Sequence, residues 1–281
     1  MAGSIDILVA VREKDIERYR TNLSSHDEFR VHVVGSIGDA FAVLHDREQR
    51  VDFFVIDINL DGALDSVRDL RKSYPRLLIV LVDEEADFGL PGLADEMSTE
   101  PFKDDDLVRR IQRMMADRRM ETLRSDSLPA IRDMTRQMRK ATGTGGKLEA
   151  AAESIIQQGY DYVGYYHIES AEPIQLNLRT QQGPKAIQVI APKNAGADDL
   201  MGWVVQNGQS RIAGPEDEPN HPLVARGRLG AVACVPVQFG DRRFGAMAVC
   251  RDRPGSITQE DVLMLELICG QLAMALSKES G

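Results

Sequence analysis

The stretch VDFFVID, residues 51–57, decides the fold of the first half of the chain. Its middle is an unbroken run of large apolar residues, which is typical of a strand buried on both faces of a parallel sheet. Its last residue, Asp57, is an acid, and side chains that do chemistry gather at the carboxyl ends of such strands. The stretch therefore predicts an α/β sheet with Asp57 at its functional edge.

Similar apolar stretches surround this strand at residues 5–11, 29–34 and 77–82. Segments with apolar residues at helical spacing separate them, and a last such segment follows Pro101-Phe102. Strands that alternate with short helices predict a parallel sheet covered on both faces. We therefore expect a doubly wound, five-stranded parallel α/β domain over residues 1–116.

The segment 107–147 differs in charge from the rest of the chain. It carries 11 Lys or Arg residues against 4 Asp or Glu, although the net charge of the whole chain is −10. Ser125-Asp126-Ser127 before Pro129 predicts a helix break and a new N-cap. The residues that then recur at helical spacing are Leu128, Ile131, Met134 and Met138. We expect residues 117–146 to form a helical linker that supports a homodimer. Two alternatives are that the linker helix packs on its own domain, or that it presents a basic patch to an acidic partner.

The remaining residues, 147–281, mix strands and helices. The predicted strands are 160–169, the weaker candidates 175–178 and 186–190, and the hairpin 230–238 and 244–251 around Gly240-Asp241. A short helix around residues 202–205 ends at Asn207-Gly208, and a long helix spans 258–276 after a sequence close to a capping box. This pattern predicts an α+β domain with a central antiparallel sheet, joined to the first domain by helices.

Composition excludes several classes of function. The acidic net charge disfavours nucleic-acid binding. No run of about 18 apolar residues and no signal peptide is evident, so we expect no membrane partner and a cytoplasmic location. The cysteines Cys234, Cys250 and Cys269 lie in apolar stretches without CxxC spacing, which indicates buried, reduced thiols.

Residues 5–116 resemble the receiver domain of response regulators. The strand order, the position of Asp57 and the motif Glu100-Pro101-Phe102 before the last helix carry the resemblance. It implies that Asp57 stands at the phosphoacceptor position.

Four positions depart from the receiver pattern. The family has two carboxylates for Mg²⁺ after the first strand, where this chain has Val11 and Arg12. It has Ser or Thr after the fourth strand and Lys before the Pro-Phe pair, where this chain has Val82 and Glu100. Asp57 alone cannot assemble a magnesium site, and Glu100 would repel a phosphoryl group. We therefore expect a pseudo-receiver in which Arg12 pairs with Asp57 or Glu100.

Residues 147–278 resemble a GAF domain. The motifs that carry the resemblance are Gly202–Gly208 (GWVVQNG), Val235-Pro236-Val237, Gly240–Val249 (GDRRFGAMAV) and the helix Leu263–Leu276. The resemblance implies a sensory or dimerisation domain, whose ligand these motifs do not identify.

The candidate residues of a ligand pocket come from a strand, a short helix, a loop and the hairpin. They are Tyr160, Tyr162, Tyr166, Trp203, His221, Arg226 and Cys234. Strand alternation puts Tyr160, Tyr162 and Tyr166 on one face, where core packing is the alternative to a pocket. The loop before the hairpin has no Cys beside His221, so no covalent bilin is expected. The cofactor is unknown, a small-molecule ligand is possible, and no metal site is predicted.

The sequence favours a cytoplasmic signal-transduction protein that acts through signalling protein partners without its own catalysis. One alternative is a phosphorelay response regulator phosphorylated at Asp57, with the GAF domain as ligand sensor or output. Another is an enzyme on the GAF fold, which would need a reactive thiol at Cys234, Cys250 or Cys269.

Overall fold

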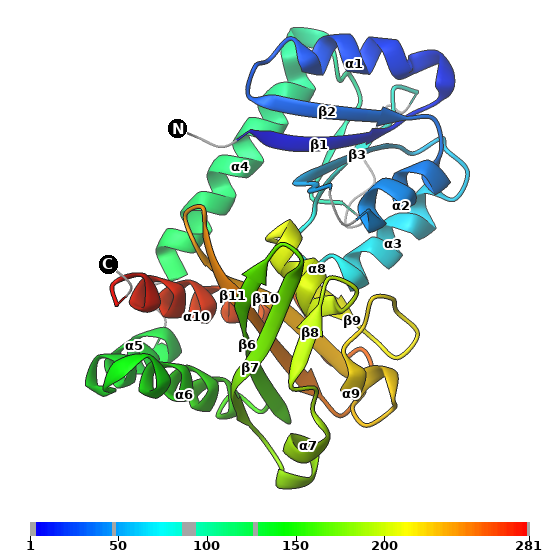
Figure 1. Cartoon of the computed structure of the whole chain (residues 1–281). Coiled ribbons are helices and arrows are strands. Elements are labelled where there is room, and N and C mark those ends of the chain that lie inside the picture. The colour runs from blue at the N-terminus through cyan, green and yellow to red at the C-terminus, as the bar shows by residue number, and fades with distance from the viewer. Residues whose placement is uncertain (1–3, 47–48, 86–93, 126–128, 280–281) are drawn as a thin grey trace. The chain divides into compact units, whose positions relative to one another are not determined.

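The computed structural model describes residues 4–46, 49–85, 94–125 and 129–279, and among these the side chains outside 119–130 (Figure 1). The chain divides into two compact units, 1–71 with 77–121 and 72–76 with 122–281. The boundary expected at residue 116 falls inside a helix, because α4 runs without a break from Asp106 to Ser125.

The first unit is built on the predicted parallel five-stranded sheet, whose strand order is β2-β1-β3-β4-β5. Its strands are β1 (Ile5–Ala10), β2 (Phe29–Val34), β3 (Phe53–Asp57), β4 (Leu78–Val82) and β5 (Glu96–Ser98). Its helices are α1 (Ile16–Ser24), α2 (Ile37–His45), α3 (Ala63–Ser73) and α4, with 3-10 turns η1 (Glu13–Asp15) and η2 (Lys103–Asp105).

Burial explains why the stretch that ends at Asp57 forms a central strand. Phe53 and Val55 are fully buried in a cluster that includes Leu107 of α4. Phe54 and Ile56, which point to the opposite face, are also buried. Both faces of β3 are therefore covered, as its continuous apolar sequence predicts.

The second unit contains a six-stranded antiparallel sheet with the order β8-β7-β6-β11-β10-β9. Its strands are β6 (Tyr162–Ala171), β7 (Ile174–Gln182), β8 (Asn194–Gly196), β9 (Arg211–Ala213), β10 (Ala231–Phe239) and β11 (Arg242–Arg251). Its helices are α5 (Pro129–Lys140), α6 (Gly143–Ile156), α7 (Lys185–Ile190), α8 (Leu200–Asn207), α9 (Pro222–Ala225) and α10 (Gln259–Ser277). The predicted hairpin is β10 and β11, and the predicted final helix is α10.

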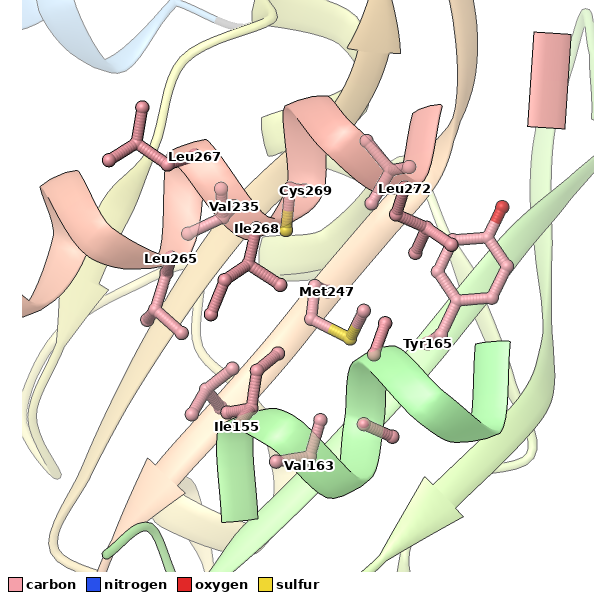
Figure 2. Packing of buried hydrophobic residues seen from close by; sticks show 14 of the residues in the cluster. Ile155, Val163, Tyr165, Val235, Met247, Leu265, Leu267, Ile268, Cys269 and Leu272 are labelled. Atoms are coloured by element: carbon pink, nitrogen blue, oxygen red, sulfur yellow. The ribbon is translucent and has the colours of Figure 1, made fainter. Parts of the chain in front are cut away.

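Helices α6 and α10 cover one face of this sheet. Ile155 of α6 and Ile268 of α10 converge on Met247 of β11 (Figure 2). Burial of each such side chain contributes about 1.5–3 kcal/mol, so this layer holds the helices on the sheet. The start of α10 is fixed by a capping box, in which Thr258 and Asp261 satisfy each other's backbone N–H groups.

Close strand pairing requires glycine at position 245 of β11. A Cβ atom built there would lie 2.0 Å from the carbonyl oxygen of Tyr166 on β6. Only glycine therefore allows β11 to approach β6 at this point.

Helix α5 belongs to the core of the second unit. Ile131, Met134 and Met138 are at most 4% exposed and lie in the same cluster as the facing side chains of α6 and α10. The predicted break at residues 126–127 and the stripe residue Leu128 lie outside the described residues. The stripe of α5 therefore packs on its own domain, which was the first alternative to a dimer contact.

One predicted strand is wrong. Residues 186–190 lie in helix α7, which begins after Pro184. Val189 is 73% exposed and Ile190 is 42% exposed. These apolar side chains therefore contribute little to the core, so their β-branched character did not indicate a buried strand.

Among the described residues, none of the helices combines the length and the apolar composition that spanning a bilayer requires.

Candidate functional site

Asp57 lies at the carboxyl end of β3, where the sequence placed it, and is 5% exposed. One of its carboxylate oxygens, Oδ1, accepts hydrogen bonds from the backbone N–H of Asn59 at 2.9 Å and from Asn59 Nδ2 at 3.2 Å. The other, Oδ2, lies 2.9 Å from Nε of Arg12. Both oxygens of this carboxylate are therefore engaged by groups of the protein itself.

Arg12 connects Asp57 to further acids. Its Nη1 donates to Oε1 of Glu85 at 2.8 Å, and its Nε lies 3.5 Å from Asp15. The hydrogen bond to Glu85 and the charge of Asp57 raise the pKa of the Arg12 guanidinium, and Arg12 lowers the pKa of Glu85. A permanent cation thus lies beside all three of these carboxylates.

The other departures from the receiver pattern lie around the same edge of the sheet without adding ligands. Val11 and Val82 are buried apolar side chains at the ends of β1 and β4. Glu100 is exposed and pairs with Lys103 at 2.9 Å, a hydrogen bond that raises the pKa of Lys103. Across the described residues, no group of three or more His, Cys, Asp or Glu side chains could hold a metal ion.

In the second unit, His221 and Tyr166 form a buried hydrogen-bonded chain. The backbone N–H of Leu223 donates to Nδ1 of His221 at 3.3 Å, which caps the short helix α9. Nδ1 therefore carries no proton, and Nε2–H can donate to the hydroxyl of Tyr166 at 3.3 Å. That hydroxyl donates in turn to the carbonyl oxygen of Pro192 at 3.0 Å. Each polar group of this chain has a partner.

Burial controls the ionisation of this chain. It lowers the pKa of His221 to about 3, so that the imidazole is neutral at neutral pH. It also raises the pKa of Tyr166 and of Tyr162, whose hydroxyl donates to Oε1 of Gln181 at 3.2 Å. Tyr162, Tyr166 and His221 are each 0% exposed, so their side chains are packed in the interior of the domain.

The remaining candidates divide between the two faces of the sheet. Trp203 of α8 and Cys234 of β10 are buried, and burial raises the pKa of Cys234, Cys250 and Cys269. Cys234 is opposite Ala248 in the β10–β11 register, which puts it on the same face as Cys250. Cys269 belongs to α10 and lies in the core cluster of that helix. Raised thiol pKa values disfavour the nucleophilic thiolate.

Tyr160 and Arg226 lie apart from this buried chain. Tyr160 precedes β6, so strand alternation does not apply to it, and it packs in the cluster beneath α10. Its hydroxyl donates to Asp261 at 3.2 Å, and Arg251 lies 4.4 Å from its ring centre. Arg226 is exposed after α9.

The sequence did not single out Arg211, although it is the largest buried cation of this unit. It is 2% exposed, and its Nη2 donates to the carbonyl oxygen of Glu218 at 3.0 Å. Its guanidinium lies 5.3 Å from the ring centre of Trp203, while Nε and Nη1 have no hydrogen-bond partner among the described residues. An arginine in a three-residue strand between polar loops gives no sequence signal of burial.

The comparisons with known proteins concern the second half of the chain. Residues 148–277 match the family described as GAF domain, and no curated protein matches the chain. The chain is similar to the GAF domain of an Acinetobacter phosphoenolpyruvate-protein phosphotransferase, with 14% identity over 54% of this chain and 92% of that one and a TM-score of 0.45.

Two other solved structures share this level of similarity. Free methionine-R-sulfoxide reductase from Neisseria meningitidis is 18% identical over 53% of this chain and 87% of that one, with a TM-score of 0.45. A GAF domain/HD domain protein from Geobacter sulfurreducens is 14% identical over 51% and 97%, with a TM-score of 0.43. The family match and the antiparallel sheet between helices lead to one assignment: residues 148–277 of this chain are a GAF domain.

Proposed function

We propose that the chain is a cytoplasmic signal-transduction protein in which a degenerate receiver domain is coupled to the GAF domain. It acts as a homodimer through contacts with signalling proteins and has no catalysis of its own. The strand order β2-β1-β3-β4-β5 supports a receiver-like first domain, because it is the order of flavodoxin-like doubly wound sheets.

The observation that carries the proposal is the ion pair between Arg12 and Asp57, 2.9 Å apart. An acceptor aspartate needs a free carboxylate oxygen and a nearby metal ion to offset the charge of the incoming phosphoryl group. Here one oxygen faces a guanidinium and the other accepts two hydrogen bonds from Asn59. The positive charge of Arg12 thus takes over at Asp57 the neutralising role that the metal ion has in a working receiver.

The buried polar side chains and cysteines of the GAF domain support the proposal that the chain has no catalysis of its own. Tyr162, Tyr166 and His221 are fully buried, and their polar atoms are satisfied within the protein: Tyr166 bonds to His221, and Tyr162 donates to Gln181. The buried cysteines, with raised pKa values, give no support to the alternative of a thiol enzyme. Because the stripe of α5 is covered by its own domain, the proposed homodimer would use other surfaces of the linker and GAF helices.

The direct test is phosphorylation with acetyl phosphate and Mg²⁺, followed by intact-protein mass spectrometry. We expect no phosphoryl group on Asp57 of the native chain. The double substitution Arg12→Asp/Glu100→Lys returns two positions to the receiver pattern, so any gain of labelling in that variant should be lost on adding Asp57→Asn.

Magnesium-dependent labelling of the native chain that Asp57→Asn abolishes would overturn the proposal. It would favour the alternative of a phosphorelay response regulator, with the GAF domain as sensor or output. Circular dichroism of each variant checks that the sheet is intact.

A further inference from the structure

A groove of about 510 Å³ lies in the GAF unit where three helices meet. It is formed by the end of α5, the start of α6 and the last turns of α10. Its volume is within the range of small-molecule sites. Its residues take no part in the hydrogen-bonded chain of Tyr166 and His221, and it belongs to a different unit from Asp57.

The lining of this groove is strongly cationic, although the chain as a whole is acidic. Four of its side chains are basic and a single one is acidic: Arg139, Lys140, Lys147 and Lys278 against Glu279. Arg139, Lys140 and Lys278 have no ion-pair partner within the part of the chain that the structure describes. Positive charge on groups that converge on a concave surface attracts an anion.

The single acidic side chain already occupies one end of the groove. Oγ1 of Thr144 donates to Oε2 of Glu279 at 2.7 Å, and Nζ of Lys147 pairs with Oε1. These two contacts lower the pKa of Glu279. Thr144 and Lys147 of α6 therefore hold the carboxylate of Glu279, which follows the last turn of α10. In this part of the groove, the chain itself supplies the bound anionic group.

The floor of the groove is partly apolar. Met138 of α5 is buried, and Met274 of α10 is half-buried beside Ala275. Methionine side chains adapt to ligands of varied shape. The groove therefore offers one region for a multiply charged anion and another for an organic group.

We propose that this groove binds a phosphate ester of a small organic molecule. The phosphate lies at Lys147, Arg139 and Lys140 and displaces the carboxylate of Glu279, and the organic group lies against the methionines. A phosphate is favoured over a carboxylate because it carries more charge and more acceptor oxygens for these cations. The site contains none of the residues around Asp57 and goes beyond the proposed signalling role by naming a ligand class.

The test is isothermal titration calorimetry of the full chain with phenyl phosphate, and with benzyl alcohol as the uncharged match. We expect saturable binding of phenyl phosphate with one site per chain, competition by inorganic phosphate, and no binding of benzyl alcohol. Affinity should fall as salt is added, because the contacts are between charges.

Matched variants locate the site. Arg139→Ala/Lys140→Ala should weaken binding about tenfold or more, since each loses a charge-assisted contact. Arg132→Ala/Arg136→Ala removes the same charge from exposed positions of α5 outside the groove and should leave the affinity within about twofold. Glu279→Gln removes the competing carboxylate and should strengthen binding several-fold.

Three results would overturn the inference. The first is the absence of saturable binding of phenyl phosphate. The second is an equal loss of affinity in the two double variants, which would indicate a non-specific effect of charge. The third is a dimer in sedimentation velocity that only Arg139→Ala/Lys140→Ala dissociates, because the groove would then be covered by a second copy of the chain.

Discussion

At the scale of single residues, the partners of a polar side chain decide what it can do. Asp57 and His221 both have titratable side chains, and both lie where a parallel strand or a loop could present them to a ligand. Arg12 and Asn59 engage the carboxylate of Asp57, and burial keeps His221 neutral between Leu223 and Tyr166. In both places the protein satisfies its own reactive group.

His221 predicts how the stability of the GAF domain depends on pH. Its pKa is about 3 in the folded domain and about 6.5 in an unfolded chain, so between these values only the unfolded chain binds the proton. The stabilising contribution is complete above pH 6.5 and is lost as the pH falls towards 3, by at most about 1.4 kcal/mol per pH unit. Urea unfolding followed by the fluorescence of Trp203, the single tryptophan, measures it.

The controls for this prediction are two histidine variants. In His221→Gln the free energy of unfolding should be lower at pH 7, because a buried network is disturbed, but it should fall less steeply with acid. In His32→Gln, at an exposed position, the native profile should be kept. If His221→Gln kept the full slope, the acid sensitivity would have to be assigned to other groups.

At the scale of elements, α5 shows that a basic amphipathic helix can cover the hydrophobic core of its own domain. Its cationic residues include Arg132, Arg136, Arg139 and Lys140, all exposed, while Ile131, Met134 and Met138 pack against α6 and α10. The same alternation of charge and apolar residues also suits a dimer contact. If α5 covers its own core, a substitution on its buried face lowers the free energy of unfolding. If α5 is a dimer contact, the same substitution changes the oligomeric state.

Met134→Ala should lower the free energy of unfolding of the GAF domain by about 2–5 kcal/mol, the usual cost of truncating a buried methionine. Arg132→Ala, two residues earlier on the exposed face, should change it by less than about 0.5 kcal/mol. Urea unfolding of both variants compares them. A change of oligomeric state in sedimentation velocity without loss of stability would mean that α5 serves as an intermolecular contact.

At the scale of the whole molecule, two hydrophobic clusters among the described residues have no residue in common. One surrounds β3 and includes Phe53, Val55 and Leu107; the other lies between α10 and its sheet and includes Met134 and Met247. Separate cores allow the two units to open separately.

Hydrogen–deuterium exchange of Met134→Ala tests this independence. Exchange should become faster in the strands and helices of residues 129–279, because their core has lost a packed side chain. Exchange in β1, β3 and β4 should stay at its native rate. Equal acceleration in both regions would show that the units unfold as one cooperative body.

The sequence by itself determined that one sheet is parallel and the other antiparallel, and it carried the resemblance to a GAF domain, but it did not predict β8 or β9. Continuous apolar stretches such as 51–57, alternating strands around Gly240-Asp241, and the capping residues at Thr258 act locally, so they can be recognised without the fold. Departures at Val11, Arg12, Val82 and Glu100 were visible for the same reason, as was the possibility that Arg12 pairs with Asp57.

Only the tertiary structure decided which candidate residues meet. It placed Tyr162, Tyr166 and His221 in one buried network, left Arg226 in solvent, and put Tyr160 against α10. It buried Arg211 against Trp203 and laid the stripe of α5 on its own domain. These outcomes depend on contacts between residues far apart along the chain, and local sequence patterns carry no information about which distant surface will cover them.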